Sequence, residues 1–131
     1  MKIEHVAIWT TDLEILKNYY KTFFNGASNQ KYINPKTQFE SYFVSFDSGA
    51  RIELMTNPSI IRSNDKERAY GGLAHISFDA GSQANVDTKA EELRKAGYPI
   101  VRGPRITGDG HYEFEILDPD GNKIEVTTKI C

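Results

Sequence analysis

The feature that most constrains this chain is an internal repeat that spans nearly all of its 131 residues. Apolar periodicity predicts a strand, a helix and three more strands in residues 1–56, and the same order again in residues 71–131. A histidine opens each repeat and a glutamate lies in its last strand: His5 with Glu53, and His75 with Glu125. The histidines are 70 positions apart and the glutamates 72, so the two halves stay closely in step. Such a repeat fixes the architecture before any single motif does.

The repeat predicts a single α+β domain of two tandem βαβββ modules, joined by a polar linker at residues 57–70. Thr11 and Glu14 have the spacing of a capping box, which predicts a helix that begins there and ends at Asn25 and Gly26. We expect curved mixed sheets that form a cleft, with the helices outside. The predicted strands span residues 2–9, 28–34, 38–46 and 51–55 in the first module and 73–79, 100–105, 111–117 and 123–128 in the second.

Strand alternation places the two histidines and two glutamates on one side of the sheets. Val6 and Ile8 form the apolar side of the first strand, as Ile52 and Leu54 do in the fourth, and the second module follows the same pattern. The other side then carries His5, Glu53, His75 and Glu125. Because the apolar side is the one a helix would cover, we expect these four side chains to point into the cleft.

Imidazole and carboxylate are good ligands for divalent first-row metals, and two of each would neutralise a dication. A single strand histidine is more often structural, and a single strand glutamate is usually solvated. Their equivalent places in both halves favour a metal site over those alternatives. Four ligands in a tetrahedron would make a closed, structural zinc site, whereas a six-coordinate metal would keep two positions for water or substrate. Zinc, nickel, cobalt, manganese and iron all accept such ligands.

The composition argues against two classes of partner. The formal net charge is only −2 with both signs interspersed, so we expect no nucleic acid. No apolar run approaches the ~18 residues of a membrane span, and no signal peptide is evident, so we expect no membrane and a cytoplasmic location. The one cysteine, Cys131, has no partner for an internal disulfide, which fits a reducing compartment. We interpret it as an incidental terminal residue.

The paired βαβββ order, the histidine that opens each unit and the run from Asp118 to Glu125 (DPDGNKIE) together resemble the vicinal-oxygen-chelate superfamily. This family contains glyoxalase I, bleomycin-resistance proteins, fosfomycin-resistance enzymes, methylmalonyl-CoA epimerase and extradiol dioxygenases. Extradiol dioxygenases and fosfomycin-type enzymes match at His5, His75 and Glu125 only. Bacterial glyoxalase I also has a carboxylate at the position of Glu53, so the four residues together favour a glyoxalase-I-like lyase or isomerase.

The resemblance implies a mechanism and an assembly. The metal would chelate two oxygens of a small oxygenated substrate, such as a hemithioacetal, and stabilise an enediolate formed when a glutamate removes a proton. Glu125 matches that base, with Glu53 opposite it. A homodimer is expected, and the ligands of one metal could come from one chain or from two. An extradiol dioxygenase or an epimerase on the same metal site, and a non-catalytic resistance protein that binds a small molecule, stay as alternatives.

One position departs from glyoxalase I. That enzyme binds the glutathione carboxylate with an arginine near the end of the first strand, where this chain has Trp9. An indole cannot form the bidentate ion pair of a guanidinium, so the thiol stays open. Trp9 is instead a candidate to stack on an apolar group of the substrate, with core packing as the alternative. His111, Glu113 and Glu115 are further candidates for substrate contact, against the alternative of solvated residues.

Overall fold

The computed structural model describes residues 1–62 and 71–130. The chain divides into two compact units, Met1–Asn64 and Asp65–Cys131. Residues 63–70 of the predicted linker, and Cys131, lie outside the described residues. Within the described part of the chain, no helix is long and apolar enough to cross a membrane.

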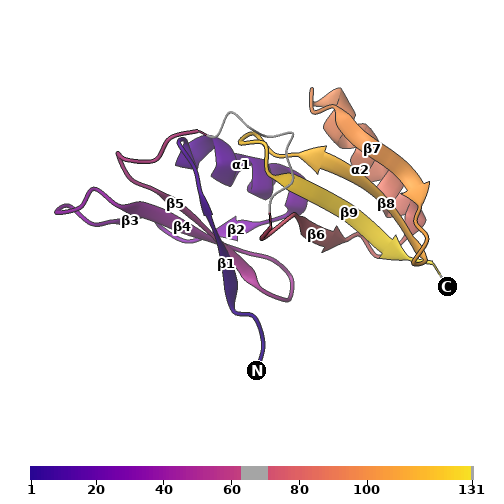
Figure 1. Ribbon diagram of the computed structural model, residues 1–131, viewed down its shortest axis with the longest axis horizontal. Coiled ribbons are helices and arrows are strands. Elements are labelled where there is room, and N and C mark those ends of the chain that lie inside the picture. Colours follow the sequence, from indigo (N-terminus) through magenta and orange to yellow (C-terminus); the bar gives the residue numbers. More distant parts are fainter. Residues whose placement is uncertain (63–70, 131) are drawn as a thin grey trace. The chain divides into compact units, whose positions relative to one another are not determined.

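Unit 1 is a mixed sheet with one helix (Figure 1). Its strands lie in the order β1-β5-β4-β2, with β3 also paired to β4. Strand β1 runs parallel to β5, and the other pairs are antiparallel. The weak strand predicted at 28–34 is instead two short strands separated by three residues that belong to no strand. The elements are β1 His5–Trp9, α1 Leu13–Phe24, β2 Ala27–Ser28, β3 Tyr32–Ile33, β4 Glu40–Ser45 and β5 Arg51–Thr56.

Unit 2 repeats this plan with the strand order β6-β9-β8-β7. Its first and last strands, β6 and β9, are again parallel neighbours. The sequence pattern predicted a strand at 73–79 that would include His75. The observed strand begins one residue later than His75, at Ile76. The predicted α+β class with two tandem βαβββ modules is confirmed. The elements are β6 Ile76–Asp79, α2 Gln83–Lys95, β7 Ile100–Ile106, β8 His111–Leu117 and β9 Lys123–Lys129.

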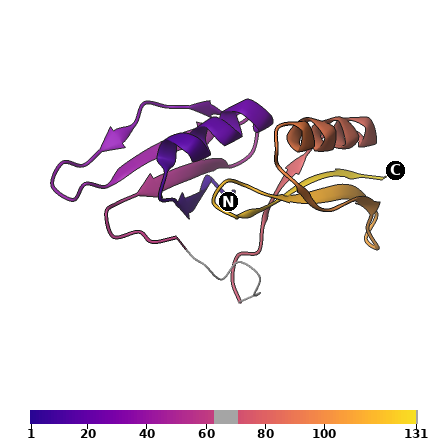
Figure 2. The same ribbon diagram turned by 90° about the horizontal axis from the view of Figure 1, so that it is seen from above.

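Each helix covers one face of the sheet in its own unit (Figure 2). Strand alternation explains which residues become the core, because Ile52 and Leu54 are buried while Glu53 between them faces the other way. A large aliphatic or aromatic side chain contributes about 1.5–3 kcal/mol when it is fully buried. The largest fully buried side chains are Leu16, Tyr20, Val44 and Leu54 in unit 1 and Val86, Leu93, Phe114, Ile116 and Ile124 in unit 2.

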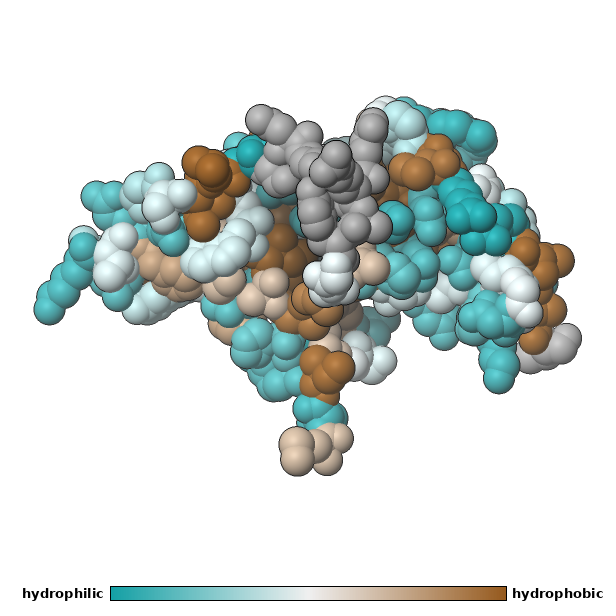
Figure 3. Space-filling model, viewed as in Figure 1, coloured by the Kyte–Doolittle hydropathy of each residue, from teal (hydrophilic) through white to brown (hydrophobic). Residues whose placement is uncertain are grey.

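The face of each sheet away from its helix is called here the open face. It carries the odd-numbered residues of β1, β5, β8 and β9, which alternate with the buried ones. In the view of Figure 3 the surface is mainly hydrophilic, with separate hydrophobic patches. Some large apolar side chains remain exposed, among them Trp9 and Tyr32. The open face therefore carries polar and aromatic side chains that remain at least partly exposed.

The start of α1 differs from the predicted capping box. Asp12 is the N-cap residue, and its side chain accepts a hydrogen bond from the backbone N–H of Ile15 at 3.1 Å. Glu14 instead accepts hydrogen bonds from the Tyr42 hydroxyl at 2.6 Å and from Lys17 at 2.8 Å. These bonds and the nearby Lys31 lower the pKa of Glu14 to about 2. Glu14 therefore ties the helix to β4 and does not cap it.

We expect Asp12→Ala to lower the free energy of unfolding by about 1 kcal/mol, because the Ile15 N–H loses the side-chain acceptor that caps the helix. Urea unfolding followed by circular dichroism measures this change. Thr11→Ala is the matched control and should change stability much less. Equal losses in the two variants would favour the capping box over the observed cap.

Candidate metal centre

Strand register brings a histidine and a glutamate together in each unit. In unit 1, Ala7 pairs with Glu53, so His5 lies two residues before the glutamate's partner on the same face. In unit 2, Ser77 pairs with Glu125, and His75 again lies two residues before that partner. The Nε2 atom is 3.7 Å from a Glu53 oxygen in the first pair and 3.2 Å from a Glu125 oxygen in the second. The structure therefore contains the same His–Glu pair twice.

The pair in unit 1 is held by a chain of charged groups. The Nδ1 atom of His5 contacts the Glu4 carboxylate, which also accepts a hydrogen bond from Arg51. These contacts lower the pKa of Glu4, with the His5 hydrogen bond as the main cause. Since a carboxylate can only accept, the His5 Nδ1 atom must donate to it. A neutral ring then turns its Nε2 lone pair toward Glu53.

An aromatic ring supports the same histidine. The Phe43 ring meets the His5 ring edge to face, with centroids 5.2 Å apart. The Arg51 guanidinium lies over Phe43, 4.1 Å from the ring centroid. Phe43 is also the direct cross-strand partner of Glu53. The orientation of His5 is therefore fixed both by hydrogen bonding and by packing.

The pair in unit 2 has acidic neighbours instead. On the open face Glu115 is directly opposite Glu125, and Glu113 is opposite Thr127 one step along the strand. Glu113 is buried, with 9% of its surface exposed. Burial raises the pKa of Glu113 and the neighbouring Glu125 raises it further, while Arg105 acts in the opposite direction. Glu125 therefore lies in a region of negative charge.

The donor atoms fit a divalent cation. Ligand bonds of ~2.1 Å place two neighbouring ligand atoms ~3.0–3.4 Å apart around one metal. The N–O separation of 3.2 Å in unit 2 lies within this range, and that of 3.7 Å in unit 1 lies slightly above it. A carboxylate behind the imidazole is a common second layer around metal-binding histidines, and Glu4 stands in that place for His5. A cation between His5 Nε2 and Glu53 would satisfy two lone pairs that otherwise face each other. Both histidines are about two-fifths exposed, so a metal could reach them.

In residues 1–62 and 71–130, no three histidine, cysteine, aspartate or glutamate side chains come together around one position. Each unit brings two predicted ligands together, His5 with Glu53 and His75 with Glu125. The union of all four stays a prediction.

The other predicted contact residues occupy defined places. Trp9 lies on the open face of unit 1 with 48% of its surface exposed, so it is not core packing. In unit 2, Glu113 and Glu115 lie on the open face next to Glu125. His111 lies at the start of β8, where its ring is 3.3 Å from Asp109 in the adjoining turn. Their part in binding a substrate stays a prediction.

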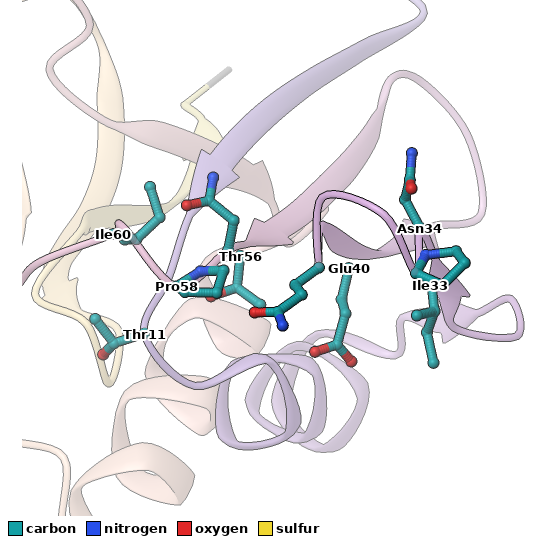
Figure 4. A pocket seen from close by; sticks show the side chains of 10 residues that line it. Thr11, Ile33, Asn34, Glu40, Thr56, Pro58 and Ile60 are labelled. Atoms are coloured by element: carbon teal, nitrogen blue, oxygen red, sulfur yellow. The ribbon is translucent and has the colours of Figure 1, made fainter.

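A pocket of about 630 Å³ lies elsewhere in unit 1. Ile33, Glu40, Thr56 and Ile60 are among its lining residues, and Figure 4 shows Glu40 directed toward the helix. Glu40 and Thr56 are cross-strand partners that belong to the helix-covered face. The pocket is therefore on the opposite face from the His5–Glu53 pair and includes no predicted ligand.

Sequence reasoning missed the support around His5, which Glu4, Arg51 and Phe43 provide. Alternation within β5 places Arg51 on the same face as Glu53, and that signal was available from the sequence. The sequence did not reveal the parallel register that sets Arg51 beside His5, because strand patterns carry no information on which residues pair.

Comparison with known proteins now establishes the family. A model of the glyoxalase/bleomycin resistance protein/dioxygenase superfamily matches residues 2–126, and the chain belongs to this superfamily. It is similar to the uncharacterized protein YqjT of Bacillus subtilis strain 168, with 26% identity over 133 residues that cover 98% of this chain and all of that protein. The predicted resemblance is confirmed.

Solved structures show the same fold. A glyoxylase/bleomycin resistance protein/dioxygenase domain from Frankia sp. EAN1pec superimposes with a TM-score of 0.82 and 21% identity, over 98% of both chains. The trypanothione-dependent glyoxalase I of Leishmania major has a TM-score of 0.76 and 20% identity, over 98% of this chain and 86% of that one. At such identities the likeness shows the fold and not the reaction.

Glu113→Gln should raise the free energy of unfolding of the metal-free protein at pH 7. The substitution removes a buried negative charge beside Glu125, and the raised pKa of Glu113 means that its ionised form disfavours the folded state. The gain should vanish below about pH 4.5, where the carboxyl is protonated in both folded and unfolded chains.

Urea unfolding at several pH values measures the effect of this substitution. Glu92→Gln is the control, because it changes the formal charge equally at an exposed site on α2. A Glu113→Gln protein that is less stable than wild type at pH 7 would contradict the expected repulsion.

Proposed function

We propose that the protein is a metal-dependent lyase or isomerase of the glyoxalase I type, acting on small molecules with two adjacent oxygens. The observation that carries this proposal is the His–Glu pair found at equivalent positions of both units, with N–O separations of 3.7 and 3.2 Å. Membership of a superfamily that includes glyoxalases supports it. The thiol partner is left open, because Trp9 has no charge with which to bind a carboxylate.

In this proposal His5, Glu53, His75 and Glu125 hold one divalent metal, Zn, Ni, Co, Mn or Fe. The residues of each pair come from one module, and the two pairs meet either within a chain or across two copies. A bound divalent cation supplies Lewis-acid stabilisation of negative charge on the substrate oxygens. The proton transfer is then carried out by side chains of the protein.

Glu125 is the proposed proton acceptor. Its carboxylate removes a proton from the substrate carbon and returns it at the neighbouring position, as general acid–base catalysis requires. The two glutamates have different surroundings: Glu115 and Glu113 neighbour Glu125, whereas Phe43 neighbours Glu53. We assign the base to Glu125, because Glu125 matches the base of the glyoxalase family and lies among further carboxylates, whereas Glu53 lies beside an aromatic ring. Glu53 is then mainly a metal ligand opposite Glu125.

Assembly as a homodimer is part of the proposal. Among the described strands, β1 lies at one edge of its sheet and β6 at one edge of the other, and each pairs with a strand on one side only. Edge strands with free backbone groups are commonly paired or covered by another chain or segment. A cytoplasmic location stays a prediction from the sequence.

Replacing Glu125 with Gln should reduce turnover about 10²- to 10⁴-fold, because the amide can still face a metal but cannot accept the proton. The assay uses hemithioacetals of methylglyoxal with several thiols, after reconstitution with each candidate metal. Glu92→Gln is the control variant. Full activity of the Glu125→Gln protein would contradict this assignment, and metal analysis of the same sample shows whether loss of metal causes the defect.

Glu4→Gln should weaken metal binding about 10- to 100-fold, because the carboxylate that orients His5 is replaced by a neutral amide. Competition with a chelator, read by metal analysis of the protein, measures the affinity. Asp47→Asn removes one charge from an exposed turn of the same unit and should leave the affinity unchanged. Unchanged affinity in the Glu4→Gln protein would show that His5 needs no such support.

A further inference from the structure

Three aromatic rings lie side by side on the open face of unit 1. The ring centroids of Trp9 and Phe39 are 6.2 Å apart and their planes are nearly perpendicular, at 89°. The centroids of Phe39 and Tyr32 are 6.1 Å apart at 57°. These three residues are called the aromatic row below. About half of the surface of Trp9 and of Tyr32 remains exposed, at 48% and 54%.

The strand register places the aromatic row next to the candidate metal ligands. Trp9 pairs with Met55, Met55 with Ser41, and Ser41 with Tyr32, so these residues cross the sheet at one level. Glu53 lies two residues before Met55 on the same face of β5, which is ~7 Å along the strand. A molecule held at Glu53 would therefore reach the row with a substituent only a few bonds away.

The side chains at the level of the sheet that includes Trp9 and Tyr32 favour an uncharged ligand. Trp9, Met55, Ser41 and Tyr32 carry no formal charge, and Ser41 is already buried. A carboxylate placed on the row would lose water and gain no cationic partner from these four residues. A flat, uncharged ring would instead bury its faces. The perpendicular planes of Trp9 and Phe39 form a corner, in which one ring can stack on the ligand while the other meets it edge to face.

We propose that the aromatic row is the subsite for an uncharged aromatic ring of the substrate. This inference rests on the proposed function and narrows it: the substrate carries an aryl group close to its two adjacent oxygens. Trp9 and Phe39 form the two walls of the corner, and Tyr32 extends the surface outward. The oxygen-bearing end of the substrate would lie beside Glu53 and His5, where the proposed metal is held. Glu53 lies two residues before Met55 on β5, and His5 lies four residues before Trp9 on β1.

The first test does not depend on any metal. The chain has one tryptophan, so the Trp9 indole N–H gives a single resonance in a ¹H–¹⁵N spectrum of the labelled protein. Benzyl alcohol added to the metal-free protein should shift this resonance saturably, and Phe39→Ala should weaken the binding severalfold. Ile15→Ala, which shortens an exposed side chain on α1, should bind like wild type. Absence of a shift would overturn the subsite.

The same spectra identify a competing occupant. A second copy of the chain on the aromatic row would make the Trp9 resonance move when the protein is diluted. Movement on dilution without any response to benzyl alcohol would overturn the proposal in favour of a protein contact. Response to benzyl alcohol at constant position on dilution supports the ring subsite.

The second test uses the metal-loaded protein and two chelators, benzohydroxamate and acetohydroxamate, which offer the same pair of oxygens with a phenyl or a methyl group. Benzohydroxamate should bind about tenfold more tightly, as expected for one stacked ring. Trp9→Ala should abolish this preference while leaving acetohydroxamate affinity unchanged, and Ile15→Ala should preserve it. Equal affinities of the two hydroxamates for the wild type would overturn the subsite without contradicting the proposed metal centre.

If neither hydroxamate binds, the proposed metal function is contradicted. The benzyl alcohol titration alone then decides whether the subsite exists.

Discussion

The parallel pairing of the first and last strands in each unit is the constraint on which the rest of the structure depends. It sets β1 beside β5 and β6 beside β9, with the helix that joins the early strands packed on a single face. It also fixes the diagonal relation of each histidine to its glutamate. A shift of one residue in either pairing would move the glutamate into the core and an aliphatic residue onto the open face. Fold and candidate site are therefore set by the same register.

Much of this could be predicted from the sequence, because periods of 2 and 3.6 are strong where one face is buried. The repeat predicted both modules, and alternation placed Glu53 and Glu125 on the face away from Ile52 and Ile124. The finer points depend on register and side-chain direction, which no periodicity contains. Two examples are the cap at Asp12, where Glu14 turns to Tyr42, and the strand boundary after His75.

The two units share a backbone plan but surround their His–Glu pairs differently. In unit 1 the Glu4–Arg51 ion pair and the Phe43 ring hold His5 in one orientation, and uncharged rings extend along the sheet. In unit 2 the corresponding surface is acidic, with Glu113 and Glu115 beside Glu125. One unit thus presents apolar surface beside its His–Glu pair, and the other presents carboxylates. The two modules therefore share the His–Glu arrangement, while the residues around it differ in charge and polarity.

The hydrogen bonds of Glu14 make part of the stability of unit 1 depend on pH in the acid range. With a pKa of about 2, this carboxylate stays ionised in the folded chain at acidities where ordinary carboxyl groups have taken up protons. The contribution of this group to stability falls gradually from about pH 4.5 to pH 2, as the unfolded chain gains the proton first. Acid would therefore weaken the attachment of α1 to β4, because this attachment includes the hydrogen bond from the Tyr42 hydroxyl to the Glu14 carboxylate.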